Sequence, residues 1–192
     1  MITARGCVCD FMLFLKRLSD FLLSLTGIIV LLPLLLIISL LVRLTIPGPA
    51  FFAQDRVGKD RRVFRILKFR TMAAHGENAG KTAGIGNFLR RTKLDELLQL
   101  FNILAGDMSF VGPRPYIPSE SKGLPDGRFA MRPGLTGLAQ VSGNTFLSWD
   151  ERTGYDLEYV DKWSPWLDLK IILRTVKVVV LGEEACVKHK QV

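Results

Sequence analysis

The longest apolar stretch of the chain runs from Phe21 to Val42, and only Pro33 and a few small residues interrupt it. As a straight helix it would be about 33 Å long at a rise of ~1.5 Å per residue, which matches a hydrocarbon core of ~30 Å. Basic residues flank both ends, and the positive-inside rule places all of them on the cytoplasmic side of a membrane. A helix that enters the membrane, bends at Pro33 and returns to the same side satisfies this rule. A kinked helix that spans the membrane stays open as the alternative.

Two short segments after this stretch have the alternating pattern of strands. They cover residues 50–54 and 63–70, and a polar turn separates them. In the second segment Lys68 and Arg70 share one face, because successive strand residues point to opposite faces of a sheet. The two cations therefore project together, either as an exposed strand face or as a binding site for phosphate.

A helical pattern begins at Leu94, and Gly106 is a suitable end for it. Its apolar residues recur at helical spacing and predict one buried face: Leu97, Leu98, Phe101 and Leu104. Residues 131–144 predict loops and short strands, and residues 149–180 are largely helical with a break at Pro165. Two tryptophans beside this break fit either a core or a membrane interface: Trp163 and Trp166.

Positive charge is concentrated in one part of the chain. The formal net charge is +8, and residues 43–93 hold twelve Lys or Arg against three Asp or Glu, an excess of nine. The remainder is therefore close to neutral. A basic block beside a hydrophobic segment is typical of a domain that lies against an anionic membrane. Nucleic acid and polyphosphate substrates fit the same charge.

Two adjacent carboxylates, Asp95 and Glu96, lie between arginines on both sides in the sequence. If Thr92 is the N-cap, Asp95 falls at the third helical position, where a capping role and the helix dipole would explain it. Neither effect explains Glu96 or the arginines. The same dipole would keep Asp95 ionised as a nucleophile, and Glu96 would hold a divalent cation such as Mg²⁺. Three arginines fit bidentate contacts to phosphate: Arg90, Arg91 and Arg114.

Six motifs occur in one order along the chain. They are Lys-Arg-x-x-Asp at 16–20, Gly-Pro-x-Phe-Phe-x-Gln-x-Arg-x-Gly at 48–58, Lys-Phe-Arg-Thr-Met at 68–72, Leu-Arg-Arg-x-x-Leu-Asp-Glu-Leu at 89–97, Gly-Asp-Met-Ser-x-Val-Gly-Pro-Arg-Pro at 106–115 and Arg-Pro-Gly-Leu-Thr-Gly-Leu-Ala-Gln-Val-x-Gly at 132–143. In these motifs the chain resembles the bacterial sugar transferase family. Because it begins just before the apolar stretch, it resembles the small monotopic phosphoglycosyl transferases of that family.

The resemblance implies an α/β, mostly helical, monotopic membrane protein. Residues 1–45 would hold a re-entrant helix kinked at Pro33, and residues 46–192 a cytosol-facing catalytic domain of short strands and interfacial helices. The implied reaction moves a sugar-1-phosphate from a UDP-sugar to undecaprenyl phosphate and releases UMP. It would proceed through a covalent aspartyl-phosphosugar intermediate, at the cytoplasmic face of the bacterial inner membrane. This is the first membrane step in the synthesis of a glycoconjugate.

The resemblance also assigns roles to residues. Asp95 maps onto the family's nucleophile, and Glu96, with Asp95, onto its Mg²⁺ site. The candidates for binding phosphate are Lys68, Arg70, Arg90, Arg91, Arg114 and Arg132. Anionic membrane lipids are expected partners, nucleic acid is not, and a homodimer is left open.

The chain departs from the family pattern at three places. Leu32 precedes Pro33 where serine is frequent, and Leu98 replaces a proline after the dyad, which predicts a more continuous helix there. Asn144 follows Gly143 where arginine is common, so a cation is missing near the expected substrate site. Two other hypotheses stay open: a membrane-tethered basic module without catalysis, and an inactive or regulatory transferase.

Overall fold

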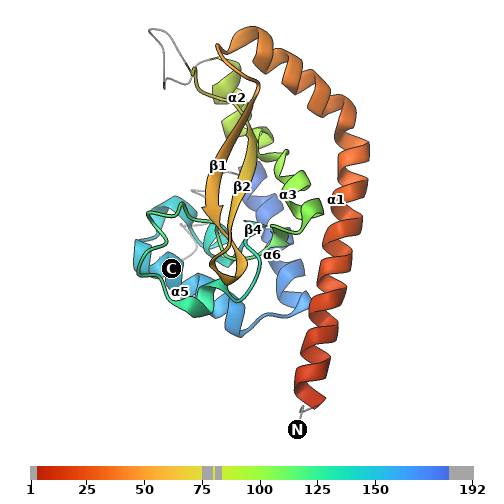
Figure 1. The fold of residues 1–192 in the computed structure, drawn as a ribbon, viewed down its shortest axis with the longest axis vertical. Helices are drawn as coiled ribbons and strands as arrows, with labels where there is room; N and C mark the ends of the chain where they lie inside the picture. The colour runs from red at the N-terminus through yellow and green to blue at the C-terminus, as the bar shows by residue number, and fades with distance from the viewer. Residues whose placement is uncertain (1–3, 75–79, 81–83, 182–192) are drawn as a thin grey trace.

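The computed structural model describes residues 4–74, 80 and 84–181, and side chains between residues 11 and 180 of these. One long helix lies along a smaller body of short helices and strands (Figure 1). Residues 182–192 of the expected catalytic domain lie outside the described residues. The helices and strands in chain order are α1 (Ala4–Thr45), β1 (Phe51–Val57), β2 (Val63–Phe69), α2 (Ile85–Arg91), α3 (Gln99–Ala105), β3 (Ser109–Val111), β4 (Gly134–Thr136), α4 (Leu138–Val141), α5 (Trp149–Asp161) and α6 (Pro165–Leu181). Four short 3₁₀ turns lie between them, η1 (Lys59–Arg61), η2 (Leu94–Glu96), η3 (Asp126–Phe129) and η4 (Asn144–Phe146).

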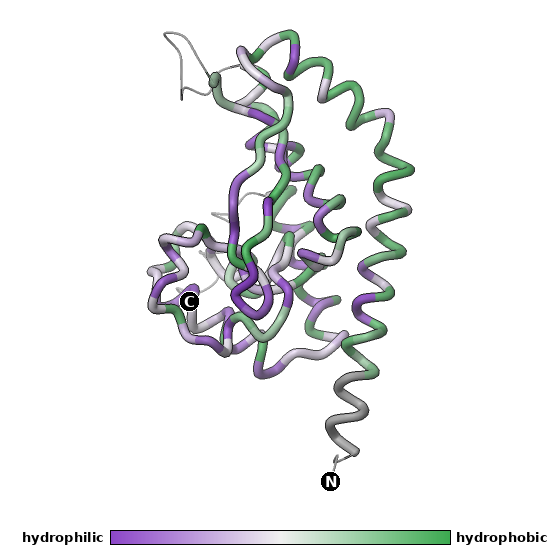
Figure 2. Tube along the Cα trace, in the orientation of Figure 1, coloured by the Kyte–Doolittle hydropathy of each residue, from purple (hydrophilic) through white to green (hydrophobic). Residues whose placement is uncertain are grey.

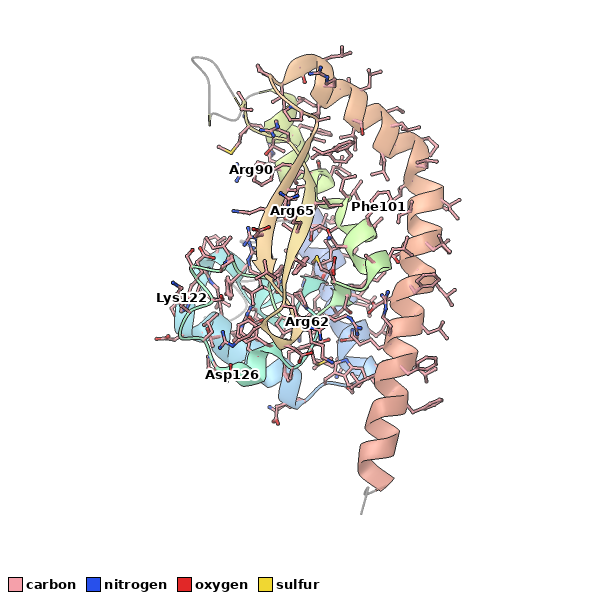
Figure 3. All side chains as sticks on the ribbon, in the orientation of Figure 1. Arg62, Arg65, Arg90, Phe101, Lys122 and Asp126 are labelled. Carbon is pink, nitrogen blue, oxygen red and sulfur yellow. The ribbon has the colours of Figure 1, made fainter. Side chains whose placement is uncertain are left out.

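Helix α1 contains the whole predicted apolar stretch and begins well before it. It is 42 residues long, with Pro33 inside it, and it changes direction in its second half (Figure 1). Proline removes a helix hydrogen bond and is the usual cause of such a bend. The helix is apolar along most of its length (Figure 2), and many of its side chains point away from the rest of the protein (Figure 3). Among the described residues it is the one helix long and apolar enough to cross a membrane.

Both halves of α1 contact the smaller body. At the N-terminal half Lys16 Nζ donates to Asp168 Oδ2 at 2.6 Å, and Arg17 donates to the carbonyls of Ile103 and Leu104 at the end of α3. The C-terminal half packs its buried residues against β2, α2 and the start of α3. This cluster consists of Leu35, Ile38, Val42, Ile46, Phe69, Leu89 and Leu98.

The two predicted strands are confirmed and form a hairpin, and the first strand extends to Val57 instead of ending at residue 54. Strands β1 and β2 pair antiparallel over seven residues each, from Phe51 opposite Phe69 to Val57 opposite Val63. The turn contains η1, where Asp60 and Arg61 have positive φ. Strands β3 and β4 form a second, parallel pair.

The region around Leu94 differs from the prediction. Instead of one helix, η2 covers Leu94 to Glu96 and α3 begins only at Gln99. Thr92 is not an N-cap: it ends α2, where its hydroxyl donates to the carbonyl of Phe88 at 2.8 Å. The residue before η2 is Lys93, whose φ of 58° breaks the helical path. Gly106 ends α3 with a φ of 95°, as predicted.

The buried face of α3 matches the prediction only in part. Leu98 is buried as predicted and Leu97 and Leu104 are half-buried, but Phe101 is 37% exposed. Leu100 and Ile103, which were not predicted, are buried as well. The reason is that α3 packs on two sides, against α1 and against β2. The predicted helical region after residue 149 is confirmed as α5 and α6, with Pro165 at the start of α6. Trp163 is half-buried in the core beside α6, and Trp166 is 62% exposed.

Candidate active site

The two carboxylates sit in η2, a single 3₁₀ turn between α2 and α3. Asp95 is 9% exposed and counts among the buried charged residues, while Glu96 is half-buried. The flanking Leu94 and Leu97 pack against the cluster formed with α1, which fixes the turn. A left-handed conformation at a non-glycine residue such as Lys93 is uncommon and is found preferentially at functional sites.

The pKa of Asp95 is shifted in the direction opposite to the one expected from a helix dipole. Burial raises the pKa of Asp95, and the neighbouring Glu96 carboxylate raises it further. Lys68, the backbone N–H of Asp95 and Lys93 act in the opposite direction and do not cancel these effects. A three-residue turn has only a small dipole, so burial dominates.

Lys68 pairs with one of the two carboxylates, whereas Arg70 contacts other groups. Lys68 Nζ lies 2.6 Å from Glu96 Oε1, in an ion pair about one quarter exposed on both sides. Arg70 instead donates from Nε to the carbonyl of Pro49 at 2.6 Å, and its guanidinium lies 5.9 Å from the centre of the Phe52 ring. The two cations predicted to project together from one strand face therefore contact different groups.

Arg114 is held in its loop from several directions. Its Nη1 donates to Asn144 Oδ1 at 3.3 Å, so the asparagine that replaces the family's usual arginine contacts another arginine. Arg128 donates to the backbone carbonyl of Arg114. Two residues after Arg114, the carbonyl of Tyr116 accepts a hydrogen bond of 2.9 Å from the backbone N–H of Val57 in β1.

Arg128 is itself one of the most buried side chains. It pairs with Asp156 of α5 at 2.8 Å, and the two side chains are 2% and 1% exposed. Its guanidinium also lies 4.3 Å from the centre of the Tyr116 ring. A buried ion pair thus supports the backbone on which Arg114 is carried.

Arg56 lies in the motif at residues 48–58 and was not predicted as a site residue. Its Nη1 donates to the carbonyl of Pro115 at 3.1 Å, directly beside Arg114. Burial lowers the pKa of Arg56, Arg114 lowers it further, and Glu120 and Glu96 raise it. Arg56 therefore lies within electrostatic range of both Arg114 and the Glu96 carboxylate. The signal in the sequence was its alternation with Gln54 on one strand face.

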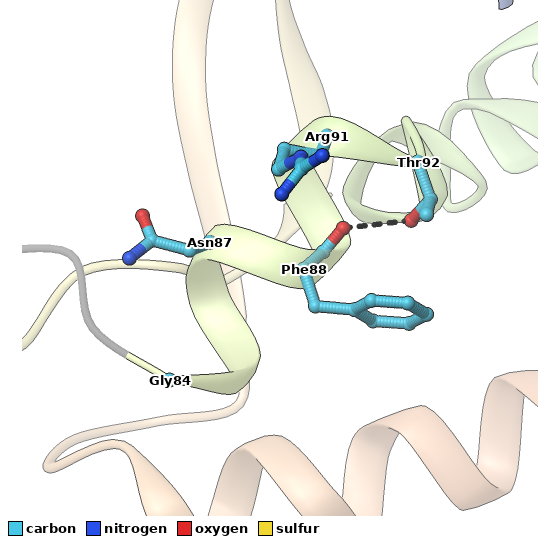
Figure 4. Close-up of a pocket in the computed structure, with 5 residues that line it drawn as sticks. All are labelled: Gly84, Asn87, Phe88, Arg91 and Thr92. Atoms are coloured by element: carbon cyan, nitrogen blue, oxygen red, sulfur yellow. Dashed lines mark hydrogen bonds between the residues drawn. The ribbon is translucent and has the colours of Figure 1, made fainter.

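The remaining predicted phosphate-binding residues lie apart from this group or next to it in sequence. Arg132 donates from Nε to the carbonyl of Gly106 at 2.8 Å, at the end of α3 opposite to η2. Arg90 lies in the last turn of α2, shortly before Asp95 (Figure 3). Arg91 lines a hollow on α2 together with Gly84, Asn87, Phe88 and Thr92 (Figure 4). Phosphate binding by these three residues stays a prediction.

The carboxylates fit a magnesium ion better than a metal that needs many protein ligands. The described residues contain no group of three or more His, Cys, Asp or Glu side chains that could hold a metal. Mg²⁺ binds through one or two carboxylates together with substrate phosphates and water. Asp95 and Glu96 can supply the carboxylates.

Comparison with known proteins agrees with the resemblance in the motifs. Residues 11–182 match the model of the family described as "Bacterial sugar transferase". The UDP-glucose:undecaprenyl-phosphate glucose-1-phosphate transferase of Escherichia coli is 38% identical over 182 residues, which cover 84% of this chain and 39% of that protein. The sugar transferase EpsL of Bacillus subtilis is 39% identical, with 88% of this chain and 89% of EpsL covered.

A third relative acts on a different sugar. The UDP-N-acetylgalactosamine-undecaprenyl-phosphate N-acetylgalactosaminephosphotransferase of Aeromonas hydrophila is 35% identical over 88% of this chain and 44% of its own length. The chain spans about two fifths of the length of several such relatives. The family model nevertheless covers nearly all of the described residues. The chain therefore belongs to the bacterial sugar transferase family.

Proposed function

We propose that the chain carries the catalytic domain of a phosphoglycosyl transferase, which moves a sugar-1-phosphate from a UDP-sugar to undecaprenyl phosphate. The observation that carries the proposal is the buried Asp95 beside the Glu96–Lys68 ion pair, in a family whose relatives are named for this reaction. The family membership disfavours the alternative of a basic module without catalysis. So do the contacts of the basic block, because Lys68, Arg61 and Arg70 are engaged within the protein.

The reaction would take place in two steps at Asp95. An oxygen of ionised Asp95 attacks the phosphorus that carries the sugar, and UMP departs with the electron pair of the broken P–O bond. A phosphate oxygen of undecaprenyl phosphate then attacks the same phosphorus and releases the Asp95 carboxylate. Lys68 orients Glu96, and the nearby guanidinium groups stabilise the charge on the departing phosphate. Mg²⁺ held by Glu96 and Asp95 would supply further charge neutralisation when bound.

Membrane attachment on one side is part of the proposal. Lys16 and Arg17 near one end of the apolar stretch, and Val42 near its other end, contact the same body. A helix that crossed the membrane fully would place these ends on opposite sides. The contacts therefore support a re-entrant α1, with the active site at the cytoplasmic face.

The outer surface of α6 supports contact with anionic lipids. Its exposed apolar side chains occupy one arc of the helix: Trp166, Leu169, Ile172, Leu173, Val176, Val179 and Val180. The three basic residues of the helix are exposed along one border of that arc: Lys170, Arg174 and Lys177. An apolar face bordered by cations is typical of a helix in the membrane interface.

The test is release of UMP from a panel of UDP-sugars in the presence of undecaprenyl phosphate and Mg²⁺. Wild-type protein is expected to release UMP, and Asp95→Asn is expected to release none above background while remaining folded. Equal turnover by the two proteins would exclude Asp95 as the nucleophile. The donor with the highest kcat/KM would identify the sugar.

A further inference from the structure

One face of the β1–β2 hairpin carries a polar row that lies beside the candidate active site. The register places Phe52, Gln54 and Arg56 opposite Lys68, Ile66 and Phe64. These six side chains share one face, since cross-strand partners point to the same side of a sheet. Lys68 binds Glu96 from this face, so the face is turned toward the two carboxylates.

The Arg56 side chain is anchored at its two terminal nitrogens. Nη1 donates to the carbonyl of Pro115 at 3.1 Å, and Nη2 donates to Gln54 Oε1 at 2.7 Å. Its Nε is buried and has no hydrogen-bond partner among the described residues. A guanidinium has five N–H donors in a rigid fork, so an anchored arginine with a buried, unpaired Nε is preorganised for an acceptor that arrives with a ligand.

The charges around Arg56 indicate which acceptor this is. Burial lowers the pKa of Arg56 most, and repulsion by Arg114 lowers it further. Lys68, on the same face of the hairpin, adds a third cation and pairs with Glu96. Set against the two carboxylates, the three cations leave one excess positive charge, which the negative charge of a bound phosphate group would offset. A diphosphate offers several oxygens to guanidinium groups.

We propose that Arg56, oriented by Gln54, binds the diphosphate of the nucleotide donor and stabilises the phosphate that leaves with the nucleoside. This inference rests on the proposed function. In the first step a bond forms between an Asp95 oxygen and the sugar-bearing phosphorus, and the bond from that phosphorus to the bridging oxygen breaks. The bridging oxygen keeps the electron pair and becomes part of UMP. The Nε–H of Arg56 donates to the phosphate on which this charge develops.

The experiment compares Arg56→Gln with a matched control on the same hairpin. Arg65→Gln removes an arginine from the opposite face of β2 (Figure 3), where Arg65 is exposed and lies 3.8 Å from Asp55. UMP release is measured without undecaprenyl phosphate, so that only the first step is followed, and then with it. The rise in Tm on adding UDP and Mg²⁺ measures diphosphate binding without chemistry.

Arg56→Gln is expected to slow the acceptor-free release of UMP by about 10- to 100-fold, the range for one charged hydrogen bond, and to reduce the UDP-induced rise in Tm. Arg65→Gln is expected to match wild type in both. The proposal is overturned if the two variants behave alike, or if Arg56→Gln slows only the step that consumes undecaprenyl phosphate, because the arginine would then serve the lipid acceptor.

Two further outcomes keep the test decisive. If Arg56→Gln does not fold, Arg56→Lys keeps the charge without the fork, and wild-type kinetics in this folded variant would overturn the proposal. If wild-type protein releases no UMP from any donor, the proposed function fails, and UDP binding alone then tests whether Arg56 binds a diphosphate. A rise in Tm with UDP that Arg56→Gln loses supports the diphosphate site, and no rise in wild type overturns it.

Discussion

Breaking the buried ion pair between Arg128 and Asp156 from one side should destabilise the protein strongly. A double-mutant cycle should show that the effects of the two substitutions are coupled. The two side chains are 2% and 1% exposed and lie 2.8 Å apart. At that distance the attraction is about 6 kcal/mol for an effective dielectric constant of ~20. Burial raises the pKa of Asp156 by more than Arg128 lowers it, so much of this attraction is offset by lost hydration. Breaking such a pair from one side leaves a buried charge and costs about 3–5 kcal/mol.

The perturbation is therefore a double-mutant cycle with Asp156→Leu and Arg128→Met. Asp156→Leu alone should lower Tm by about 6–20 °C, because 1 kcal/mol corresponds to about 2–4 °C in a chain of this size. In the Arg128→Met background the same change should cost less than about 1 kcal/mol, since no buried charge is then left unpaired. Thermal unfolding in detergent micelles, followed by intrinsic fluorescence, measures each Tm.

The control lies on the same helix. Glu158 pairs with Lys162 at 3.0 Å across one turn of α5 and is exposed, so Glu158→Ala should cost only about 0.3–0.5 kcal/mol. If Asp156→Leu lowered Tm equally in both backgrounds, the two residues would be uncoupled and the reasoning refuted. Arg128→Met should also reduce UMP release, because it removes the donor to the Arg114 carbonyl.

Three other changes are expected to have specific outcomes. Because the pKa of Asp95 is raised in the folded protein, stability falls as pH rises above the ordinary pKa of an aspartate. Asp95→Asn should therefore raise Tm at about pH 8 and leave it unchanged near pH 3. An equal difference in Tm at the two pH values would contradict this. Gly134→Ala should lower the free energy of unfolding by more than about 3 kcal/mol in a denaturant titration, because the added Cβ would lie 2.1 Å from the Gly112 nitrogen. Gly154→Ala in α5 should instead raise the free energy of unfolding by about 0.5–1 kcal/mol, because its Cβ would meet nothing within 4 Å. In single-tryptophan variants bound to anionic vesicles, brominated lipid should quench the fluorescence of Trp166 and leave that of the half-buried Trp163 unchanged. Equal quenching of the two would argue against lipid contact by α6.

The elements that the sequence predicts correctly are those whose patterns are local. The apolar stretch, the alternation in the hairpin and the glycine that ends α3 are each recognised from neighbouring residues, and α1, β2 and Gly106 follow them. The turn that holds Asp95 was wrongly predicted as part of a helix. Its position is fixed by the packing of Leu94 and Leu97 against residues of α1 and β2 that are distant in the sequence, which no local pattern reveals.

The candidate site was predictable in its residue types more than in its geometry. The sequence indicates Asp95, Glu96 and Lys68, and the structure brings Lys68 onto Glu96 across 28 residues. Arg132 has the same charge as Arg114 but lies at the far end of α3, and only the fold separates them. Arg56 reaches the site because β1 pairs in one particular register, which the sequence does not specify by itself.

The contacts of Lys16 and Arg17 have a consequence for how the protein is made. Their partners lie 152 and about 86 residues later in the chain, so α1 is synthesised long before it can dock. At about 5–20 residues per second, the interval before Asp168 is made lasts roughly 8–30 s. Until their partners are synthesised, Lys16 and Arg17 cannot form these contacts, and under the proposed one-sided attachment they would act as topological signals that keep the N-terminal end of α1 on the cytoplasmic side. The same two residues later become structural, so a substitution at either should alter orientation during insertion as well as the stability of the finished protein.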